Sequence, residues 1–484
     1  MPVADDPRKW SNFRKNFLLF QVSFGTMIGG LSANIQTPAV GEMQADLPAT
    51  AAQISLSLSL FILLQGIVPL FWSAISEVKG RKFVYIVSMA IYIVGSVVVA
   101  TSKNIGILLG FRCFQAAGSS AVMSIGAATL ADIYDPVERG TKMGIYYIAP
   151  LLGPSLGSIL GGGLTTAFTW RGPFYFLAIM GVLVFMSFLL FFRDTFRHER
   201  SLTYQNVLKE RLRESKAKDS FVEEKAGRVS PTHDESDLEK QEIPVVAPEV
   251  IPEIELGLMD VNPLKPMAVI LSRKYNLFML FASGLYYAFA FVLVYTTSRS
   301  LDTHYHLDPL KIGFVLVAYG IGTILGSIMG GRWSDHQLSR IKSKEGGVTP
   351  EMRLKSTVHG LVIFPLCVVG YAWVIQERVN LAGVCAMLFA CGFTSIFVYT
   401  STLAYIVDSN VGRSSSAVAL NSFFRCTLAF IFEEIAVPMQ DGLGDGWMYT
   451  IIAFIMGVSG VCTAVVMFKG EQWRKETEMK QLAA

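Results

Sequence analysis

The sequence alternates between long stretches without a charged side chain and short stretches that carry several charges. Residues 17–37 and 83–100, for example, contain no Asp, Glu, Lys or Arg. A stretch of about 18 or more apolar residues is long enough to cross the hydrocarbon core of a bilayer as a helix. Only 16% of the 484 residues are charged, whereas a soluble domain has about a quarter. The pattern therefore predicts an all-α membrane protein.

Twelve such stretches can be placed, six on each side of a long charged segment. The first six cover residues 17–37, 54–75, 83–100, 105–131, 143–164 and 173–192, and the second six cover residues 277–297, 312–329, 358–375, 381–407, 415–437 and 448–468. We therefore predict twelve transmembrane helices in two six-helix pseudo-symmetric bundles, residues 17–192 and 277–468. Residues 1–16 and 469–484 are expected to be short cytoplasmic termini.

Residues 193–276 form the predicted linker between the bundles. Its central part, residues 210–255, is rich in Lys, Glu, Asp and Pro. Such a segment cannot bury enough apolar surface to offset the entropy lost on ordering, so we expect the linker to be largely disordered. Residues 264–271 are more apolar and predict a short interfacial helix that leads into the seventh span.

The basic residues are distributed unevenly between the two sides of the predicted membrane. With the N-terminus in the cytoplasm, the termini and short cytoplasmic loops hold twenty Lys and Arg residues without counting the linker, and the outer loops hold five, Lys103, Arg171, Arg299, Lys311 and Arg378. Short cytoplasmic loops of multi-pass proteins carry the excess of Lys and Arg. We therefore expect both termini and the linker on the cytoplasmic side.

A charged turn occurs at the same place in both halves, which suggests duplication of a six-helix unit. The turn after the second span reads Ser73-x3-Glu77-x2-Gly80-Arg81-Lys82, and the turn after the eighth reads Gly331-x3-Asp335-x4-Arg340. The Glu77 carboxylate is expected at the N-terminal end of another helix, where the helix dipole favours negative charge. Arg81 is expected to pair with Asp132 at the cytoplasmic end of the fourth span.

Two arginines lie inside predicted spans, where a guanidinium costs at least about 2.5 kcal/mol and must face the bundle interior or water. Arg112 is followed by Gln115 in the fourth span, and Arg425 follows Asn421 on one face of the eleventh. We expect Arg112 to act in proton coupling or substrate contact. One cavity arginine in each half would favour an anionic or acidic substrate.

Other polar and aromatic residues complete a predicted substrate and proton pathway: Asn34, Gln65, Tyr286, Tyr287, Tyr399 and Glu433. Aromatic walls with a few polar groups suit amphipathic organic cargo; for each residue taken singly, core packing is an equal alternative. Glu433 and Glu434 are interpreted first as interfacial caps next to Pro438. The alternative is a carboxylate that takes up and releases a proton.

These motifs resemble signatures of the major facilitator superfamily. Residues 73–82 are similar to its G-x3-D-x2-G-R-K motif, with Ser for the first Gly and Glu for the Asp, and Arg112-x2-Gln115-x2-Gly118 is similar to another. Gly153-Pro154-x2-Gly157-x3-Gly161 in the fifth span resembles the motif of the antiporter branch, and Gly322, Gly326 and Gly330 repeat its glycine spacing in the eighth. Residues 130–144 and 404–417, with Trp170-Arg171, resemble fungal twelve-span drug:proton antiporters.

The resemblance implies the major facilitator fold and roles for several of these residues. Glu77, Gly80, Arg81, Lys82, Asp132 and Asp335 are expected to act as a conformational latch. The fifth and eighth helices are expected to be neighbours, and we predict that they pack glycine face to glycine face. Pro154 is expected to soften or kink the fifth helix where the halves rock.

The function implied is secondary active transport. The sequence has no Gly-x4-Gly-Lys-Ser/Thr phosphate loop, no metal-ligand spacing and no nucleophile elbow, so we expect neither an enzyme nor a cofactor or metal. Members of the resembled branch export quinidine-like drugs, weak organic acids, polyamines or spore-wall precursors. We predict a proton-coupled antiporter for small organic molecules, acting as a monomer in the plasma membrane, with no nucleic-acid partner.

Three alternatives stay open at this stage. The first keeps the fold and makes the protein an exporter of citrate-like organic acids. The second makes it a non-transporting nutrient sensor. The third places it in the vacuolar membrane.

Overall fold

The computed structural model describes residues 6–134, 136–197, 264–345, 350–410 and 414–483, and these are almost entirely helical. The first half contains η1 (Pro7–Lys9), α1 (Asn12–Asn34), η2 (Thr37–Ala39), α2 (Val40–Asp46), α3 (Ala51–Lys79), α4 (Arg81–Thr101), α5 (Ile105–Ile133), α6 (Pro136–Phe168) and α7 (Gly172–Phe191). The second contains α9 (Leu264–Leu271), α10 (Lys274–Tyr305), α11 (Pro309–Glu345), η4 (Pro350–Thr357), α12 (Val358–Gln376), α13 (Leu381–Asp408) and α14 (Ser414–Ala483).

The predicted all-α membrane fold is confirmed. Ten helical stretches among the described residues are long and apolar enough to cross a bilayer. One of them, Ser416–Thr477, lies in α14, which Gly444 divides with a φ of 73°. In α6 the apolar part is the shorter Leu156–Phe168. The number twelve stays a prediction, which is reached when α14 is counted as two spans and α6 as one.

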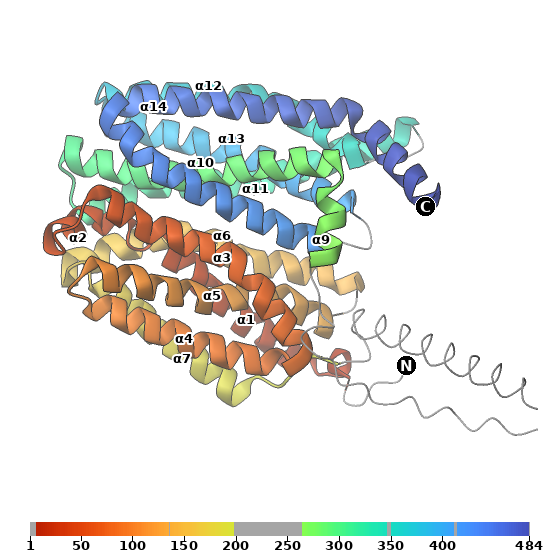
Figure 1. Ribbon diagram of the computed structural model, residues 1–484, viewed down its shortest axis with the longest axis horizontal. Coiled ribbons are helices and arrows are strands. Elements are labelled where there is room, and N and C mark those ends of the chain that lie inside the picture. The colour runs from red at the N-terminus through yellow and green to blue at the C-terminus, as the bar shows by residue number, and fades with distance from the viewer. Residues whose placement is uncertain (1–5, 135, 198–263, 346–349, 411–413, 484) are drawn as a thin grey trace, which may run out of the picture.

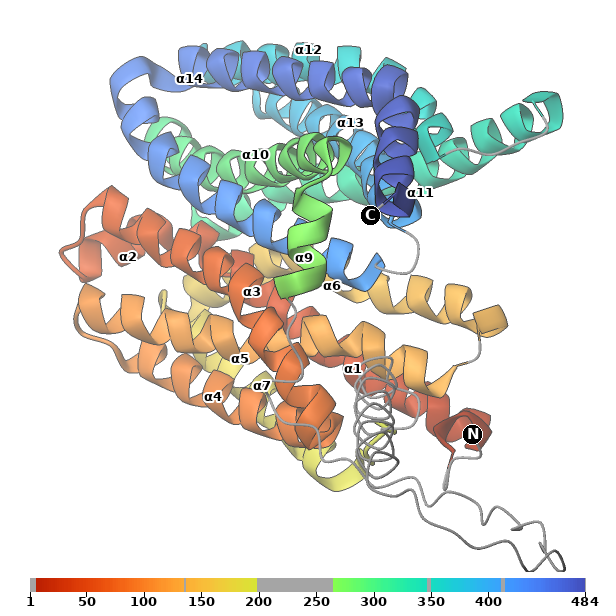
Figure 2. The same ribbon diagram turned by 45° about the vertical axis from the view of Figure 1, so that its right-hand side comes forward.

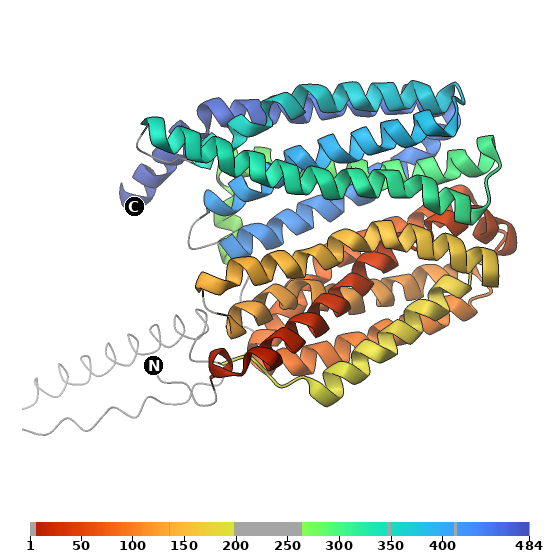
Figure 3. The ribbon, with the colours of Figure 1, turned by 180° about the vertical axis from the view of Figure 1, so that it is seen from behind.

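The helices form two bundles that lie side by side, α1 to α7 and α10 to α14 (Figure 1). In the first bundle α1 lies along α6, and α3 and α4 lie along α5; in the second, α10 lies along α14 and α11 along α13. The two large hydrophobic clusters divide in nearly the same way: one lies in the second bundle, and the other lies in the first bundle and includes Tyr295 and Val437 of the second. Between the bundles, α3 lies along α14. On the opposite side α6 lies along α11 (Figure 3).

The described ends of the chain, η1 and the last turns of α14, lie at the same end of the molecule as α9 (Figure 1 and Figure 2). We call this the terminal end and the opposite one, where α2 lies, the far end. At the terminal end two helices extend past their predicted spans: α11 continues to Glu345, and α14 continues to Ala483. Arg474 of this extension contacts the buried Glu351 of η4 at 3.3 Å, and Trp473 stacks on Phe278. These contacts attach the end of α14 to the second bundle.

Short polar residues fix where helices begin at the far end. Thr50 and Gln53 form a capping box at the start of α3. The side chains of Asn104 and Asn380 accept backbone N–H groups at the starts of α5 and α13. Such caps satisfy N–H groups that the first turn of a helix leaves without a partner.

The predicted glycine-to-glycine packing of the fifth and eighth spans is wrong, although α6 and α11 do lie side by side. The glycine triplet of α6 faces α1, where a Cβ at Gly161 would overlap the carbonyl oxygen of Ile35. The triplet of α11 faces α13, where a Cβ at Gly322 would overlap the carbonyl oxygen of Phe389. Each triplet therefore serves close packing inside its own bundle.

Different glycines form the close contact between α6 and α11. A Cβ at Gly162 would overlap the carbonyl oxygen of Pro309, and a Cβ at Gly313 would lie 2.5 Å from the carbonyl oxygen of Ser158. A helix face that is already occupied by α1 or α13 cannot also meet the other bundle, so the neighbouring face does so. Pro154 lies within α6, and its side chain falls outside the described residues.

Candidate transport pathway and latch

Arg112 of α5 is fully buried in the first bundle. Its Nη1 donates to the carbonyl oxygen of Ser32 at 3.1 Å and to Oε1 of Gln115 at 2.6 Å. Its guanidinium carbon lies 4.3 Å from the centre of the Phe61 ring of α3. Nε and Nη2 have no hydrogen-bond partner among the described residues, and no described carboxylate forms an ion pair with them. A buried guanidinium that is only partly satisfied is costly, which is typical of a functional position.

Neighbouring hydroxyl groups hold the Arg112 pair in place. Nε2 of Gln115 donates to the hydroxyl of Ser96 at 2.8 Å. The hydroxyl groups of Ser32 and Tyr92 lie 2.7 Å apart. These contacts connect α1, α4 and α5, so the orientation of the guanidinium is fixed by three helices.

Arg425 of α14 occupies an aromatic site in the second bundle. Its Nη1 donates to the hydroxyl of Tyr399 of α13 at 2.6 Å, and its guanidinium carbon lies 4.2 Å from the ring centre of Tyr287 of α10. Its Nε is buried and has no partner in the described part of the chain. A cation that is held by aromatic faces without a carboxylate is chemically suited to bind an anionic group.

The other predicted pathway residues are more dispersed. Tyr286 packs on Phe364 with ring centres 5.5 Å apart, in the hydrophobic core of the second bundle and not beside Arg425. Nε2 of Gln65 donates to a backbone carbonyl of α1 at 3.4 Å. Asn34 and Asn421 are buried, and each has one amide atom without a hydrogen-bond partner among the described residues.

Glu433 and Glu434 lie inside a continuous helical part of α14, well before Gly444. The interpretation as interfacial caps is wrong for Glu433, because the residue is only 1% exposed. Its Oε2 is buried without a hydrogen-bond partner in the described residues, and its charge interacts with that of Arg112. Oε1 of Glu434 accepts a hydrogen bond from Ser59 of α3 at 2.6 Å.

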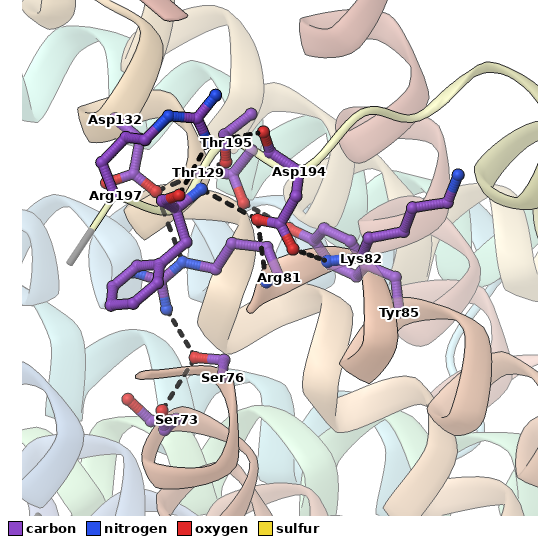
Figure 4. A network of polar contacts seen from close by, with 11 residues as sticks. Ser73, Ser76, Arg81, Lys82, Tyr85, Thr129, Asp132, Asp194, Thr195 and Arg197 are labelled. Atoms are coloured by element: carbon purple, nitrogen blue, oxygen red, sulfur yellow. Dashed lines mark hydrogen bonds and ion pairs between the residues drawn. The ribbon is translucent and has the colours of Figure 1, made fainter. Parts of the chain in front are cut away.

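The predicted pair of Arg81 and Asp132 is present at the terminal end of the first bundle (Figure 4). Nε of Arg81 lies 3.3 Å from Oδ2 of Asp132, at the end of α5. Nη1 of Arg81 donates to the hydroxyl of Ser76 in the last turns of α3, and the hydroxyl of Thr195 donates to Asp132 at 3.4 Å. One arginine thus connects α3, α4 and α5.

Asp194, just after α7, caps the start of α4, a role that the sequence analysis did not assign to it. Its carboxylate accepts the backbone N–H groups of Arg81 and Lys82 at 3.2 and 3.3 Å (Figure 4). It therefore caps the N-terminus of α4, where negative charge is favourable. Oε2 of Glu77 is buried and has no hydrogen-bond partner among the described residues.

The expected loop after the second span is helical apart from one residue. α3 runs to Lys79, and Gly80, with a φ of 85°, separates it from α4. A Cβ at Gly80 would overlap the Asp194 carboxylate, and a positive φ is strained for other residues. Lys82 contributes its backbone N–H, while its side chain extends away from the cluster (Figure 4).

The second bundle has an equivalent ion pair that sequence reasoning missed. Nε of Arg353, in η4 before α12, lies 2.6 Å from Oδ2 of Asp408 at the end of α13. Arg81 and Asp132 occupy the corresponding places, at the third and fourth helices of the first bundle. The predicted counterpart after the eighth span lies within α11, and the side chain of Asp335 there falls outside the described residues.

At the far end the two bundles are joined by four hydrogen bonds between described residues. On the α3–α14 side, Ser55 donates to the carbonyl oxygen of Glu433 at 3.3 Å, in addition to the contact of Ser59 with Glu434. Two residues of α10 donate to backbone carbonyls of the first bundle: Tyr295 at 3.2 Å and Ser298 at 2.8 Å. We call the α3–α14 part of this contact the far-end seam.

The comparison with known families agrees with this architecture. The sequence model of the Major Facilitator Superfamily matches residues 22–432, which is most of the chain. The chain belongs to this superfamily. It is therefore a multi-pass membrane transporter. The crystal structure of the human organic anion transporter MFSD10 (TETRAN) shares the fold, with a TM-score of 0.57 and 14% identity over 93% of this chain and 99% of that one.

Curated relatives cover the chain almost completely. The MFS antiporter QDR3 of Candida albicans is 26% identical over 100% of this chain and 82% of its own length. Quinidine resistance protein 3 of Saccharomyces cerevisiae is 24% identical over 100% of this chain and 86% of its own length. Citrate exporter 1 of Aspergillus niger is 26% identical over 96% of this chain and 88% of its own length. The resemblance to fungal antiporters and citrate exporters is thereby confirmed.

Proposed function

We propose that the protein is a proton-coupled antiporter that exports small organic molecules by alternating access. Arg112 is the main support, because a fully buried guanidinium with two unpartnered nitrogen atoms needs a ligand or an exchanging charge to offset its cost. The names of the relatives, an antiporter, a quinidine resistance protein and a citrate exporter, support antiport and small organic cargo.

In the proposed cycle the two bundles rock about a site between Arg112 and Arg425. The hydrogen bonds at the far end support a resting state that is closed on that side. Export requires these bonds to break. The cluster of Arg81, Asp132 and Asp194 is proposed to act as a latch at the opposite end, because it ties α3, α4, α5 and the segment after α7 together.

An organic-acid exporter is the second candidate, and Arg425 favours it. Its guanidinium is stacked on Tyr287 and bonded to Tyr399, and no described carboxylate neutralises it. A carboxylate-bearing cargo would supply the missing negative charge and can bind a guanidinium through two parallel hydrogen bonds. A cationic drug would be repelled at the same place.

We further propose that the terminal end faces the cytoplasm, that the transporter resides in the plasma membrane and that it works as a monomer. The excess of Lys and Arg in the segments at that end supports the orientation.

The test is transport by the purified protein in vesicles, with quinidine and citrate as separate labelled probes. An antiporter accumulates its cargo in acid-inside vesicles, because protons leave as the cargo enters. Uptake of either probe that a pH gradient does not change would contradict proton antiport. Arg425→Gln should lower citrate uptake by about tenfold, with the exposed Arg378→Gln as control; equal loss of quinidine uptake would argue against the acid-exporter candidate.

A further inference from the structure

The far-end seam brings two adjacent acidic residues, Glu433 and Glu434, to the contact between the bundles. Ser55 and Ser59 of α3 lie one helical turn apart and bond, in order, to the backbone of Glu433 and the side chain of Glu434. Both acids therefore sit where α3 and α14 must separate if the far end opens.

The two acids differ in their environments. Glu434 is partly exposed, and Oε1 has Ser59 as a hydrogen-bond donor. Glu433 is 1% exposed, its Oε2 has no partner and it forms no ion pair among the described residues. One of the two carboxyl groups is thus satisfied in the closed seam, and the other is not.

The charged and titratable groups around Glu433 are few. Glu434 lies on its own helix, Arg112 acts on it from α5 and Tyr295 of α10 faces both acids. The facing residues of α3 are uncharged serines, and the described residues of α12 and α13 bring no further charge to it. Arg112 favours the charged form of Glu433 and Glu434 disfavours it. Because these two effects oppose each other, the burial of Glu433 decides whether the charged or the neutral form is favoured.

The free-energy cost of closing the seam over Glu433 depends strongly on whether the Glu433 carboxyl group is charged or protonated. A buried carboxylate oxygen without a hydrogen-bond donor loses its hydration and gains no partner, whereas a neutral carboxylic acid loses much less. In an open seam, water can solvate the carboxylate. The charge on Glu433 therefore opposes closure, and a bound proton removes this opposition.

We propose that Glu433 is the proton-binding carboxyl of the exchange cycle and that its protonation permits the far-end seam to close. This inference rests on the proposed antiport function. Glu433 takes a proton from water on the far side when the seam is open, and the seam then closes. Glu433 returns the proton to water on the terminal side, and no other bond forms or breaks.

The inference can be tested without knowing the cargo. Spin labels are attached to Ala52→Cys of α3 and Gly442→Cys of α14, in a chain whose native cysteines are replaced. Both positions lie towards the far end; Ala52 is exposed, and a Cβ at Gly442 meets open space. The distance between the labels is measured by pulsed electron paramagnetic resonance in lipid nanodiscs from about pH 5 to about pH 8.

The expected result is a shift from short to long distances as the pH rises, because the deprotonated carboxyl favours the open seam. Glu433→Gln should remain in the short-distance state at every pH. Glu433→Asp retains a titratable group and should keep a pH-dependent shift. Glu434→Gln is the matched control, and it should respond as the wild type does.

Two outcomes would overturn the inference. One is a wild-type seam whose distances do not change with pH, and the other is Glu433→Gln that switches as the wild type does. These outcomes are separate from the transport test. If the wild type shows pH-driven uptake but the seam of Glu433→Gln still responds to pH, the proposed antiport function stands and the assignment of Glu433 as the proton-binding carboxyl is wrong.

Discussion

At the scale of single residues, polar side chains in this protein provide hydrogen-bond partners for groups that would otherwise have none, either at the end of a helix or inside a bundle. Asp194 accepts two free N–H groups at the start of α4. The buried guanidinium of Arg112 donates to the backbone carbonyl oxygen of Ser32 in α1. In both cases the partner comes from a distant part of the sequence, so the interaction depends on the assembled bundle.

Asp194→Ala should lower the thermal stability of the protein. The substitution leaves the N–H groups of Arg81 and Lys82 without their acceptor, and loss of such a cap costs about 1 kcal/mol. The melting temperature of the purified protein in detergent should fall. The melting temperature of Asp194→Asn should fall less, because one acceptor oxygen remains. Glu377→Gln, at an exposed position, is the control. An unchanged melting temperature for the alanine variant would show that the cap adds no stability.

Arg112→Lys should reduce pH-driven uptake by about tenfold or more while the protein still reaches the membrane. A lysine ammonium cannot reproduce the planar guanidinium that bonds Ser32 and Gln115 and stacks on Phe61. Arg112→Ala should abolish uptake. Uptake is measured in vesicles, and surface expression is measured on the same cells with Arg378→Lys as reference. Normal uptake by the lysine variant would remove the guanidinium from the pathway.

At the scale of helices, hydrophobicity and charge made the spans and the two bundles predictable, because a bilayer imposes a minimum apolar length. The pair of Arg81 and Asp132 was also predictable from the ends of neighbouring spans. The partners of the glycine triplets were not, because spacing shows which residues share a face but not which helix meets it. Asp194 was missed because it directly follows the sixth span, in a segment that its composition marked as linker.

Gly161→Ala should destabilise the protein, whereas Gly163→Ala, two residues further along α6, should not. A Cβ at Gly161 would overlap the carbonyl oxygen of Ile35 in α1, so α1 and α6 would have to move apart; at Gly163 the nearest atom, from Leu310, is 3.7 Å away. Overpacking of this kind costs about 1–3 kcal/mol. The thermal midpoints of both variants are compared in one detergent. Equal midpoints would show that the α1–α6 contact tolerates separation.

At the scale of the whole molecule, the two bundles use the same plan with different partners. Each has an ion pair at the ends of two consecutive spans. Arg81 at the start of α4 pairs with Asp132 at the end of α5, and Arg353 just before α12 pairs with Asp408 at the end of α13. Both pairs lie at the ends of helices and outside the proposed pathway. The pathway residues are not repeated in this way: Arg112 contacts a serine carbonyl, and Arg425 contacts tyrosines. The two equivalent ion pairs agree with the predicted duplication of a six-helix unit, while the proposed cargo and proton sites depend on residues specific to each half.

The arrangement of the ends makes a prediction about topology. Lys103 lies between α4 and α5, and Gly442 lies two residues before Gly444, which divides α14. Both connections are at the far end, while Lys475 belongs to the last part of α14, which ends at the terminal end (Figure 1). The basic segments are expected to keep the terminal end in the cytoplasm. In a chain without its native cysteines, Lys103→Cys and Gly442→Cys should react with a membrane-impermeant maleimide on intact cells, and Lys475→Cys only after permeabilisation. The reverse pattern would invert the orientation. Labelling of Lys103→Cys and Gly442→Cys from opposite sides would be incompatible with two bundles that cross one membrane side by side, because both positions belong to the same end of the structure.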